Sequence, residues 1–260
     1  FVAKRDPDTA RLVVSFIGLN GISERHIYPT LPPDHLVTDL DRRWQFFAVL
    51  DCAKGFHQVE LAEESKPLTA FTVSSPRSVA GTYFYNRLPM GLVGATDAHD
   101  YRVYKALADV TDRILHEDLL LGAETLDDLA AKLSALLERC HAHCITLSPS
   151  KFVVARQVVF GRYLISPGQY RRDPRMVEKL SAYPPPATKK ELKSFLGLAT
   201  QLLTHSNELH PEVAQLFRLT TRSAAFAWDE VHGDLFERIK RTLTRDNVLA
   251  YFDRAAPTRL

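Results

Sequence analysis

Short apolar runs separated by polar turns dominate the first half of the chain, and this pattern predicts β-strands. The strongest run, at 46–51, ends in a single carboxylate, Asp51, which is followed by a glycine-containing turn. Further single strands are predicted at 57–61, 68–73 and 82–88, and two strands around an acidic turn are predicted at 112–121. Two hairpins are also predicted: one within 1–19, with its second strand at 12–17, and a small one that pairs 152–154 with 158–160.

Apolar residues spaced three and four apart predict helices, most of them later in the chain. Thr125 with Asp128, and Thr188 with Glu191, are capping-box pairs that open two of these helices. The predicted helices cover residues 34–40, 94–108, 125–140, 188–203 and 229–243. The mixture predicts an α+β protein, and the stiff run of prolines at 184–186 predicts a boundary between lobes.

Size and composition narrow the class of protein. A chain of 260 residues exceeds the usual single domain, so two or three lobes are expected. Its three cysteines cannot form a disulfide framework, and no apolar run reaches the ~20 residues of a membrane helix, which predicts an intracellular location away from membranes. The chain opens at Phe1 within a predicted strand, so a fragment of something longer is expected.

Charge is unevenly distributed along the chain. Residues 1–150 carry 15 Lys+Arg against 20 Asp+Glu, a net of −5, and residues 151–260 carry 18 against 11, a net of +7. Acid in one half and base in the other is typical of a metal site beside a phosphate-binding surface. Uneven solvated faces are an equally simple interpretation of the charge alone.

Two acidic points interrupt otherwise apolar strands. Asp51 ends the first run, and Glu117 and Asp118 follow the run at 114–115. Carboxylates are costly to bury unless they are paired or bind a cation, and two divalent ions held by such acids can catalyse phosphoryl transfer. The alternatives are a turn-capping aspartate at 51 and a solvated turn at 117–118.

The order of several short motifs resembles the reverse transcriptase of gypsy-type LTR retrotransposons, which is related to the retroviral enzymes. The resemblance covers nearly the whole chain. The matching segments are 11–20, which ends in Leu19-Asn20, then Tyr28-Pro29, the palm motif at 47–59 with its Leu50-Asp51 and Gly55-Phe56-His57-Gln58, Thr69-Ala70-Phe71, Leu88-Pro89-Met90-Gly91-Leu92, Lys193-Ser194-Phe195-Leu196-Gly197-Leu198 and 226–252. Each motif alone is weakly specific, whereas seven in the same order indicate common ancestry.

This resemblance implies a right-hand polymerase with fingers, palm and thumb, and the palm built on an antiparallel sheet. The expected boundaries are fingers at 1–45, palm at 46–165 with a fingers insertion at about 62–85, thumb at 166–222, and a connection from 223 to 260. That connection would lead to an RNase H domain, which is expected to be absent from this chain.

The resemblance also implies roles for individual residues near the site. Asp51, Glu117 and Asp118 would be the catalytic carboxylates and would bind two Mg²⁺ ions, with Mn²⁺ as an alternative. Phe56 would exclude the ribose 2′-hydroxyl of an incoming nucleotide; its other interpretation is an ordinary core aromatic. The remaining candidates for deoxynucleoside triphosphate binding are Arg11, Cys52 and Ala53 through their backbone, Pro89, Met90 and Gly91.

A primer paired with an RNA or DNA template is the expected partner, and the sequence leaves the oligomeric state unknown. Phe160 and Gly161 lie where the family grips the primer. A basic set from the positively charged half would hold the phosphate backbone without reading sequence: Arg162, Arg171, Arg172, Lys189 and Lys190. A solvated surface is the alternative for these charges.

The chain departs from the family pattern at the second acidic motif. The family's Tyr-x-Asp-Asp reads Leu115-His116-Glu117-Asp118 here, so glutamate occupies the first acidic position. The extra methylene displaces the carboxylate, and catalytic placement tolerates little displacement. A catalytically inactive nucleic-acid-binding or protein-interaction module is therefore the alternative function. A zinc module built on Cys140 and Cys144 is a third, against which core cysteines at a helix end are the simpler interpretation.

Overall fold

A computed structural model describes residues 2–3, 10–29, 31, 33–74, 80–110, 113–116, 118–203, 209–221, 226–245 and 249–251. The chain forms two compact units, each assembled from separate stretches. The first unit comprises 1–31, 48–122 and 126–153, and the second comprises 32–47, 123–125 and 154–260. Strand pairings within the sheets are antiparallel where their register is defined, and helices accompany them, which confirms the α+β class.

Most of the first unit is built around a four-stranded sheet of order β6-β7-β3-β8. Its strands are β3 (Phe46–Asp51), β6 (Arg113–His116), β7 (Asp118–Ala123) and β8 (Val153–Ala155). Phe47 and Ala48 in β3, and the three leucines 119–121 in β7, are completely buried. Strands covered on both faces carry continuous apolar runs rather than alternating ones, and for this reason the sequence predicts both β3 and β7.

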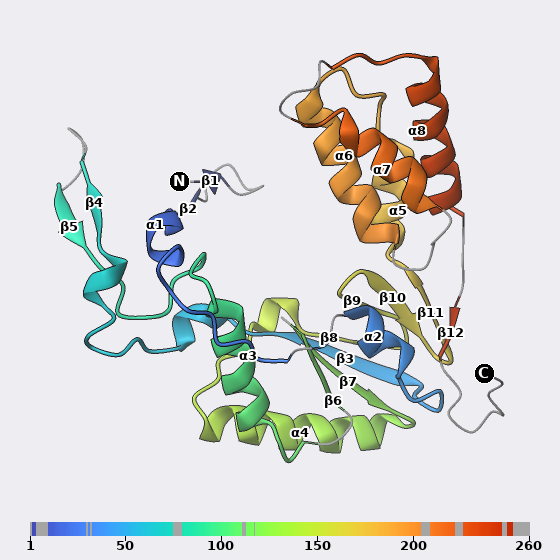
Figure 1. The fold of residues 1–260 in the computed structure, drawn as a ribbon. Helices are drawn as coiled ribbons and strands as arrows, with labels where there is room; N and C mark the ends of the chain where they lie inside the picture. The colour runs from blue at the N-terminus through green and yellow to red at the C-terminus, as the bar shows by residue number, and fades with distance from the viewer. Residues whose placement is uncertain are drawn as a thin grey trace. The chain divides into compact units, whose positions relative to one another are not determined.

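Two helices lie along one face of this sheet, α3 (Ala95–Ala106) and α4 (Leu126–Ala142) (Figure 1). The predicted helix at 125–140 is thus confirmed, and α4 buries Leu129, Leu136 and Cys140. α3 also anchors the preceding chain, because Arg25 Nε donates to Asp97 Oδ2 at 2.8 Å. This contact, followed by a hydrogen bond from Tyr28 N, lowers the pKa of Asp97 against the opposing effect of burial.

The rest of the first unit contains shorter elements. These are β1 (Val2–Ala3), β2 (Ala10–Arg11), α1 (Ile17–Asn20), the 3₁₀ turns η1 (Gly55–Gln58), η2 (Pro67–Thr69) and η3 (Pro149–Lys151), and the hairpin β4 (Phe71–Val73) with β5 (Gly81–Tyr83). The predicted strand at 12–17 is wrong, because Leu12, Val13 and Ile17 are exposed and β2 ends at residue 11. The predicted strand at 57–61 is also wrong, since η1 replaces its start and only Glu60 forms an isolated bridge, to Arg87.

The second unit contains another four-stranded sheet, of order β12-β11-β10-β9. Its strands are β9 (Val158–Phe160), β10 (Tyr163–Ser166), β11 (Gln169–Arg172) and β12 (Leu249–Ala250). The predicted hairpin of 152–154 with 158–160 is therefore wrong, because β8 joins the sheet of β3 while β9 pairs with β10. The expected palm–thumb boundary after residue 165 falls inside β10.

Four helices of the second unit share one hydrophobic core (Figure 1): α5 (Pro174–Ser181), α6 (Lys189–Leu202), α7 (His210–Arg218) and α8 (Glu230–Leu243). Phe195 of α6 and Phe236 of α8 lie at its centre, with ring centroids 4.4 Å apart. The predicted helices at 188–203 and 229–243 are thus confirmed. The residues of α8, expected in a connection, instead share the core of α5–α7.

A short helix from the N-terminal half, α2 (Pro33–Thr38), also belongs to the second unit. Its Asp34 accepts hydrogen bonds from the hydroxyl of Tyr163 and the guanidinium of Arg162. No helix in the described part of the chain combines the length and apolar composition needed to cross a membrane.

Candidate functional site

The strand order of the central sheet brings two of the predicted acids to the same end of that sheet. Gln45 N, just before β3, donates to Ala123 O at the end of β7 (2.8 Å), and β3 and β7 are hydrogen-bonded neighbours. The two strands therefore run antiparallel, and the end of β3 at Asp51 lies beside the start of β7 at Asp118. Glu117, between β6 and β7, lies outside the described residues.

The environment of Cys52 relates both carboxylates to one buried thiol. Burial raises the pKa of this thiol to about 12, and Cys140, Asp51 and Asp118 add to the rise against the opposing effect of Arg102. A carboxylate affects a neighbouring titration only when it is near, since the interaction falls with distance and is screened by solvent. Asp51 and Asp118 thus both lie near the same buried thiol.

Lys151 was not identified from the sequence, yet it is the direct partner of Asp51. Its Nζ donates to Asp51 Oδ2 at 2.7 Å, and Ser148 N donates to the Asp51 carbonyl at 2.8 Å. Lys151 is largely exposed, with 63% of its side-chain surface accessible against 23% for Asp51. The pair spans 100 residues of sequence, so no local motif signals it.

The donor set fits a hard divalent cation. Carboxylate oxygens are the ligands that Mg²⁺ prefers. The carboxylate of Asp51 already forms an ion pair with the Lys151 ammonium. That ammonium is solvent-exposed, so the pair is held at the surface rather than in the core. The described residues contain no cluster of three metal-binding side chains, and the third predicted acid, Glu117, lies outside them.

The turn after Asp51 positions Phe56 against α3. Lys54 adopts the left-handed conformation (φ 51°) and leads into η1. Phe56 then contacts the ring of His99 edge-on, with centroids 5.5 Å apart. His99 is buried and its Nδ1 lies 3.2 Å from Asp100 Oδ1, so the ring that supports Phe56 is itself held in place.

Gly55 permits this close approach, because a Cβ at this position would lie 2.6 Å from His99 Nε2. Gly55→Ala is expected to lower the free energy of unfolding by about 1–3 kcal/mol, the usual result of overpacking. Urea unfolding followed by circular dichroism measures this change.

The matched control is Gly197→Ala in α6, where a Cβ would meet nothing within 4 Å. That variant is expected to gain about 0.5–1 kcal/mol from improved helix propensity. The double variant Gly55→Ala/His99→Ala should lose less than the sum of its single variants. Strict additivity would contradict the steric explanation.

The backbone amides after Asp51 differ from expectation. Ala53 N donates to Thr146 O at 2.9 Å, and Cys52 forms an antiparallel bridge with Leu147. The Ala53 amide is therefore already hydrogen-bonded within the protein. Arg11, the last residue of β2, is described only in its backbone.

The predicted Pro89-Met90-Gly91 segment is held by a residue from α1. Asn20 Nδ2 donates to Gly91 O (2.9 Å), and Val93 N donates to Asn20 Oδ1 (2.8 Å). Gly91 has φ +95°, a conformation that glycine adopts readily. Pro89 is buried, whereas Met90 and Gly91 are exposed, so these two residues are the accessible part of this segment.

The predicted primer-contacting residues Phe160 and Gly161 belong to the second unit. Phe160 is buried in β9, and Gly161, with φ +59°, forms the turn into β10. Only the turn is accessible to a ligand. Arg162 in the same turn donates to Asp34 and to Gln201 O, both at 3.3 Å, so its guanidinium already has protein partners.

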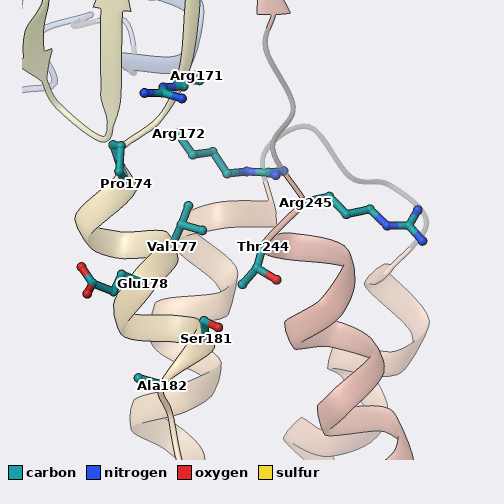
Figure 2. A pocket seen from close by; sticks show the side chains of 9 residues that line it. All are labelled: Arg171, Arg172, Pro174, Val177, Glu178, Ser181, Ala182, Thr244 and Arg245. Carbon is teal, nitrogen blue, oxygen red and sulfur yellow. The ribbon is translucent and has the colours of Figure 1, made fainter.

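Arg171 and Arg172 lie at the end of β11, beside a cavity of about 580 Å³ bordered by α5 and the end of α8. Figure 2 shows Arg172 extending toward α8, whereas Arg171 does not. Arg172 is buried, donates to Leu243 O at 3.4 Å, and has a pKa that burial lowers. Arg172 thus links β11 to α8, and Arg171 is more accessible.

Lys189 and Lys190 begin α6 but have different surroundings. Lys189 Nζ donates to Thr221 O at 2.8 Å, whereas Lys190 is exposed. Of the basic residues predicted to hold nucleic acid, Lys190 is exposed, Arg162, Arg171 and Lys189 are half-buried, and Arg172 is buried. Among the cysteines considered for zinc, Cys140 is buried and Cys144, beyond the end of α4, is exposed.

Comparison with known proteins shows a family match over most of the chain. Residues 13–199 match the reverse transcriptase (RNA-dependent DNA polymerase) family. The chain is 30% identical over 243 residues to the Pol polyprotein of Feline endogenous virus ECE1, covering 89% of this chain and 23% of that protein. It is 27% identical over 241 residues to the enzymatic polyprotein of Cestrum yellow leaf curling virus, covering 89% of this chain and 36% of that protein.

Solved structures show the same fold. The foamy viral protease-reverse transcriptase in complex with dsDNA matches 98% of this chain and 53% of its own chain, with a TM-score of 0.81 at 20% identity. The same foamy viral protein in complex with an RNA/DNA hybrid matches 91% of this chain and 32% of its own, with a TM-score of 0.80 at 19% identity. The chain thus spans about half or less of the length of these relatives.

Proposed function

Because the chain belongs to the reverse transcriptase (RNA-dependent DNA polymerase) family, we propose that it copies RNA into DNA at the site formed by Asp51 and Asp118. The observation that carries this proposal is that these two acids lie at the same end of the central sheet, where the Lys151 ammonium pairs with Asp51. The proposed setting is a retroelement polyprotein, and the motifs favour a gypsy-type LTR retrotransposon.

Asp51, Asp118 and the neighbouring Glu117 would hold two Mg²⁺ ions. When bound, such ions stabilise the attacking 3′-hydroxyl oxygen and the leaving pyrophosphate. The chain's own contribution is positioning: β3 and β7 fix the two described carboxylates, and the exposed Lys151 ammonium balances the negative charge of Asp51. Lys151 would then be close to the reacting phosphates, as a mobile positive charge on an exposed stem.

Phe56 would face the sugar of an incoming deoxynucleoside triphosphate and exclude a 2′-hydroxyl by its volume. Support comes from its fixed position, which His99 and the η1 turn determine. Arg11 and the exposed Met90 complete the proposed nucleotide contacts, together with the Cys52 backbone, Pro89 and Gly91.

A primer–template duplex is the proposed partner. The foamy viral relative is seen with dsDNA and with an RNA/DNA hybrid, and residues 151–260 of this chain carry a net charge of +7. We propose that the exposed Lys190 contacts the phosphate backbone directly, with the half-buried Arg171 as a further contact, and that the turn at Gly161 contacts the primer. Arg162, Arg172 and Lys189 would mainly stabilise the local structure through their hydrogen bonds within the protein.

We propose that the fingers and the palm comprise the first unit together with those residues of β3 and β7 that are assigned to the second unit. The proposed thumb is the helical core of α5–α7, extended to include α8. An RNase H activity is not part of this proposal.

The direct test is primer extension on an RNA template with Mg²⁺ or Mn²⁺ and deoxynucleotides. Extension that requires Asp51 and a divalent ion supports the proposal, and undetectable extension by folded protein contradicts it. The second candidate, an inactive nucleic-acid-binding module, is favoured by Glu117 in place of the family's aspartate. It predicts primer–template binding with a steep salt dependence and no extension.

Phe56→Val is expected to lower the preference for deoxynucleotides over ribonucleotides by roughly 10²-fold, the scale on which an apolar pocket discriminates a hydroxyl. The measurement is the ratio of kcat/KM for the two nucleotide types. Phe84→Val, at an exposed phenylalanine of the same unit, is the control and should leave the ratio unchanged. An unchanged ratio in Phe56→Val would remove Phe56 from the gate role.

A further inference from the structure

The side-chain amide of Gln58 joins two segments that are 88 residues apart in the sequence. Its Oε1 accepts a hydrogen bond from Thr146 N (2.9 Å), and its Nε2 donates to Thr146 O (2.8 Å) and to Ala53 O (2.6 Å). Both ends of the amide are therefore used, and the Thr146 residue is paired as it would be by a neighbouring strand.

These bonds lie along a continuous seam between the 51–58 turn and the 143–151 segment. Ala53 N also donates to Thr146 O, and Ser148 N donates to Asp51 O. One edge of the seam carries Asp51 and Phe56, and the other carries Lys151, the partner of Asp51.

Arg102 of α3 also joins the two segments of this seam. Its guanidinium donates to Gln58 O (2.8 Å) and to the carbonyls of His143 (3.2 Å) and Cys144 (3.3 Å). The Gln58 backbone is thus fixed independently of its side chain, so loss of the amide should free the turn without displacing residue 58 itself.

The turn requires such support because its backbone is strained. Lys54 has φ 51° and ψ 48°, a left-handed conformation that is unfavourable for a residue with a Cβ. Conformations of this kind persist only where the surrounding contacts over-determine them.

We propose that Gln58 is a positioning residue whose amide holds the strained 51–58 turn against the 143–151 segment, and so sets the placement of Phe56 and of Asp51 relative to Lys151. The part that concerns nucleotide selection rests on the proposed polymerase function. The contact that the Gln58 amide makes between the turn and the 143–151 segment, the Gln58 clamp, does not depend on that function.

Cys52 offers a reporter that needs no catalysis. Its side chain is buried within the seam, so the thiol should react slowly with iodoacetamide. The experiment uses the full chain with Cys144→Ser, which removes the exposed thiol. Gln58→Leu, Gln58→Glu and the exposed control Gln215→Leu are compared, with modification at residue 52 quantified by peptide mass spectrometry.

Gln58→Leu is expected to raise the labelling rate of Cys52 by roughly tenfold, the scale of one lost hydrogen bond. Gln58→Glu should do at least as much, because its carboxylate would face two carbonyl oxygens. Global unfolding is measured in the same variants by urea titration. The inference is overturned if Cys52 labelling is unchanged, or if it rises no more than the unfolding constant does.

The second readout is the deoxynucleotide-to-ribonucleotide ratio of kcat/KM, which is independent of the fraction of folded protein. It should fall several-fold in Gln58→Leu and stay constant in Gln215→Leu. A constant ratio together with faster Cys52 labelling overturns the positioning of Phe56. If the unsubstituted chain extends no primer, the proposed function fails, whereas the labelling result still decides the clamp.

Discussion

Asp51→Asn is expected to abolish primer extension, lowering the rate by at least about 10³-fold. Losing a carboxylate that is proposed to bind both metal ions would remove several kcal/mol of transition-state stabilisation, at about 1.4 kcal/mol per factor of ten. The substitution keeps the shape of the side chain and leaves Lys151 without its anion. Since Lys151 is exposed, the free energy of unfolding should change by less than about 1 kcal/mol.

The measurement is single-nucleotide extension under burst conditions, with primer–template affinity measured by fluorescence anisotropy. Affinity should remain close to that of the unsubstituted chain. Asp234→Asn, at an exposed carboxylate on α8, is the control and should extend normally. Comparable extension by the two variants would exclude Asp51 from the catalytic centre.

Phe195→Ala is expected to have the largest effect on stability. This side chain is fully buried in the core of α5–α8 and packs against Phe236 with ring centroids 4.4 Å apart. Truncation of a buried phenylalanine removes contacts and leaves a cavity, at a cost of about 3–5 kcal/mol. Loss of the helical core should also weaken primer–template binding, if these helices form the thumb as proposed.

Lys193→Ala provides the matched control on the same helix. Lys193 is exposed, so this variant should stay within about 0.5 kcal/mol of the unsubstituted chain. Urea unfolding, followed by tryptophan fluorescence and circular dichroism, compares the two variants. A loss below about 1 kcal/mol in Phe195→Ala would mean that the α6 core contributes little to folding.

The fold class and the long elements could be predicted because their patterns are local. β3 has a continuous apolar run, and α4, α6 and α8 repeat apolar residues at helical spacing. β11 was missed because its sequence is Gln-Tyr-Arg-Arg and one of its buried side chains is Arg172. The false strand at 12–17 shows the converse, since apolar residues with β propensity form no strand without a partner to pair with.

The candidate site was predictable only in part for a similar reason. Asp51 and Asp118 each stand out against an apolar run, so the sequence identifies them one at a time. Lys151 and Gln58 act through contacts across about 90 to 100 residues, and their own neighbourhoods carry no sign of the partner. The hydrogen bond of the Ala53 amide to Thr146 depends on that same long-range pairing, so the sequence gives no sign that this amide has a protein partner.

The contacts of Asp34 with Tyr163 and Arg162 have a consequence for how this chain can exchange parts with its relatives. The second unit is discontinuous: residues 32–47 from the N-terminal half are built into it together with 154–260. A recombination crossover near residue 153 would therefore pair the β10 residues of one lineage with the Asp34 of another. A crossover that changes the residue at position 34, 162 or 163 would remove these hydrogen bonds from the second unit, so the two stretches are structurally linked.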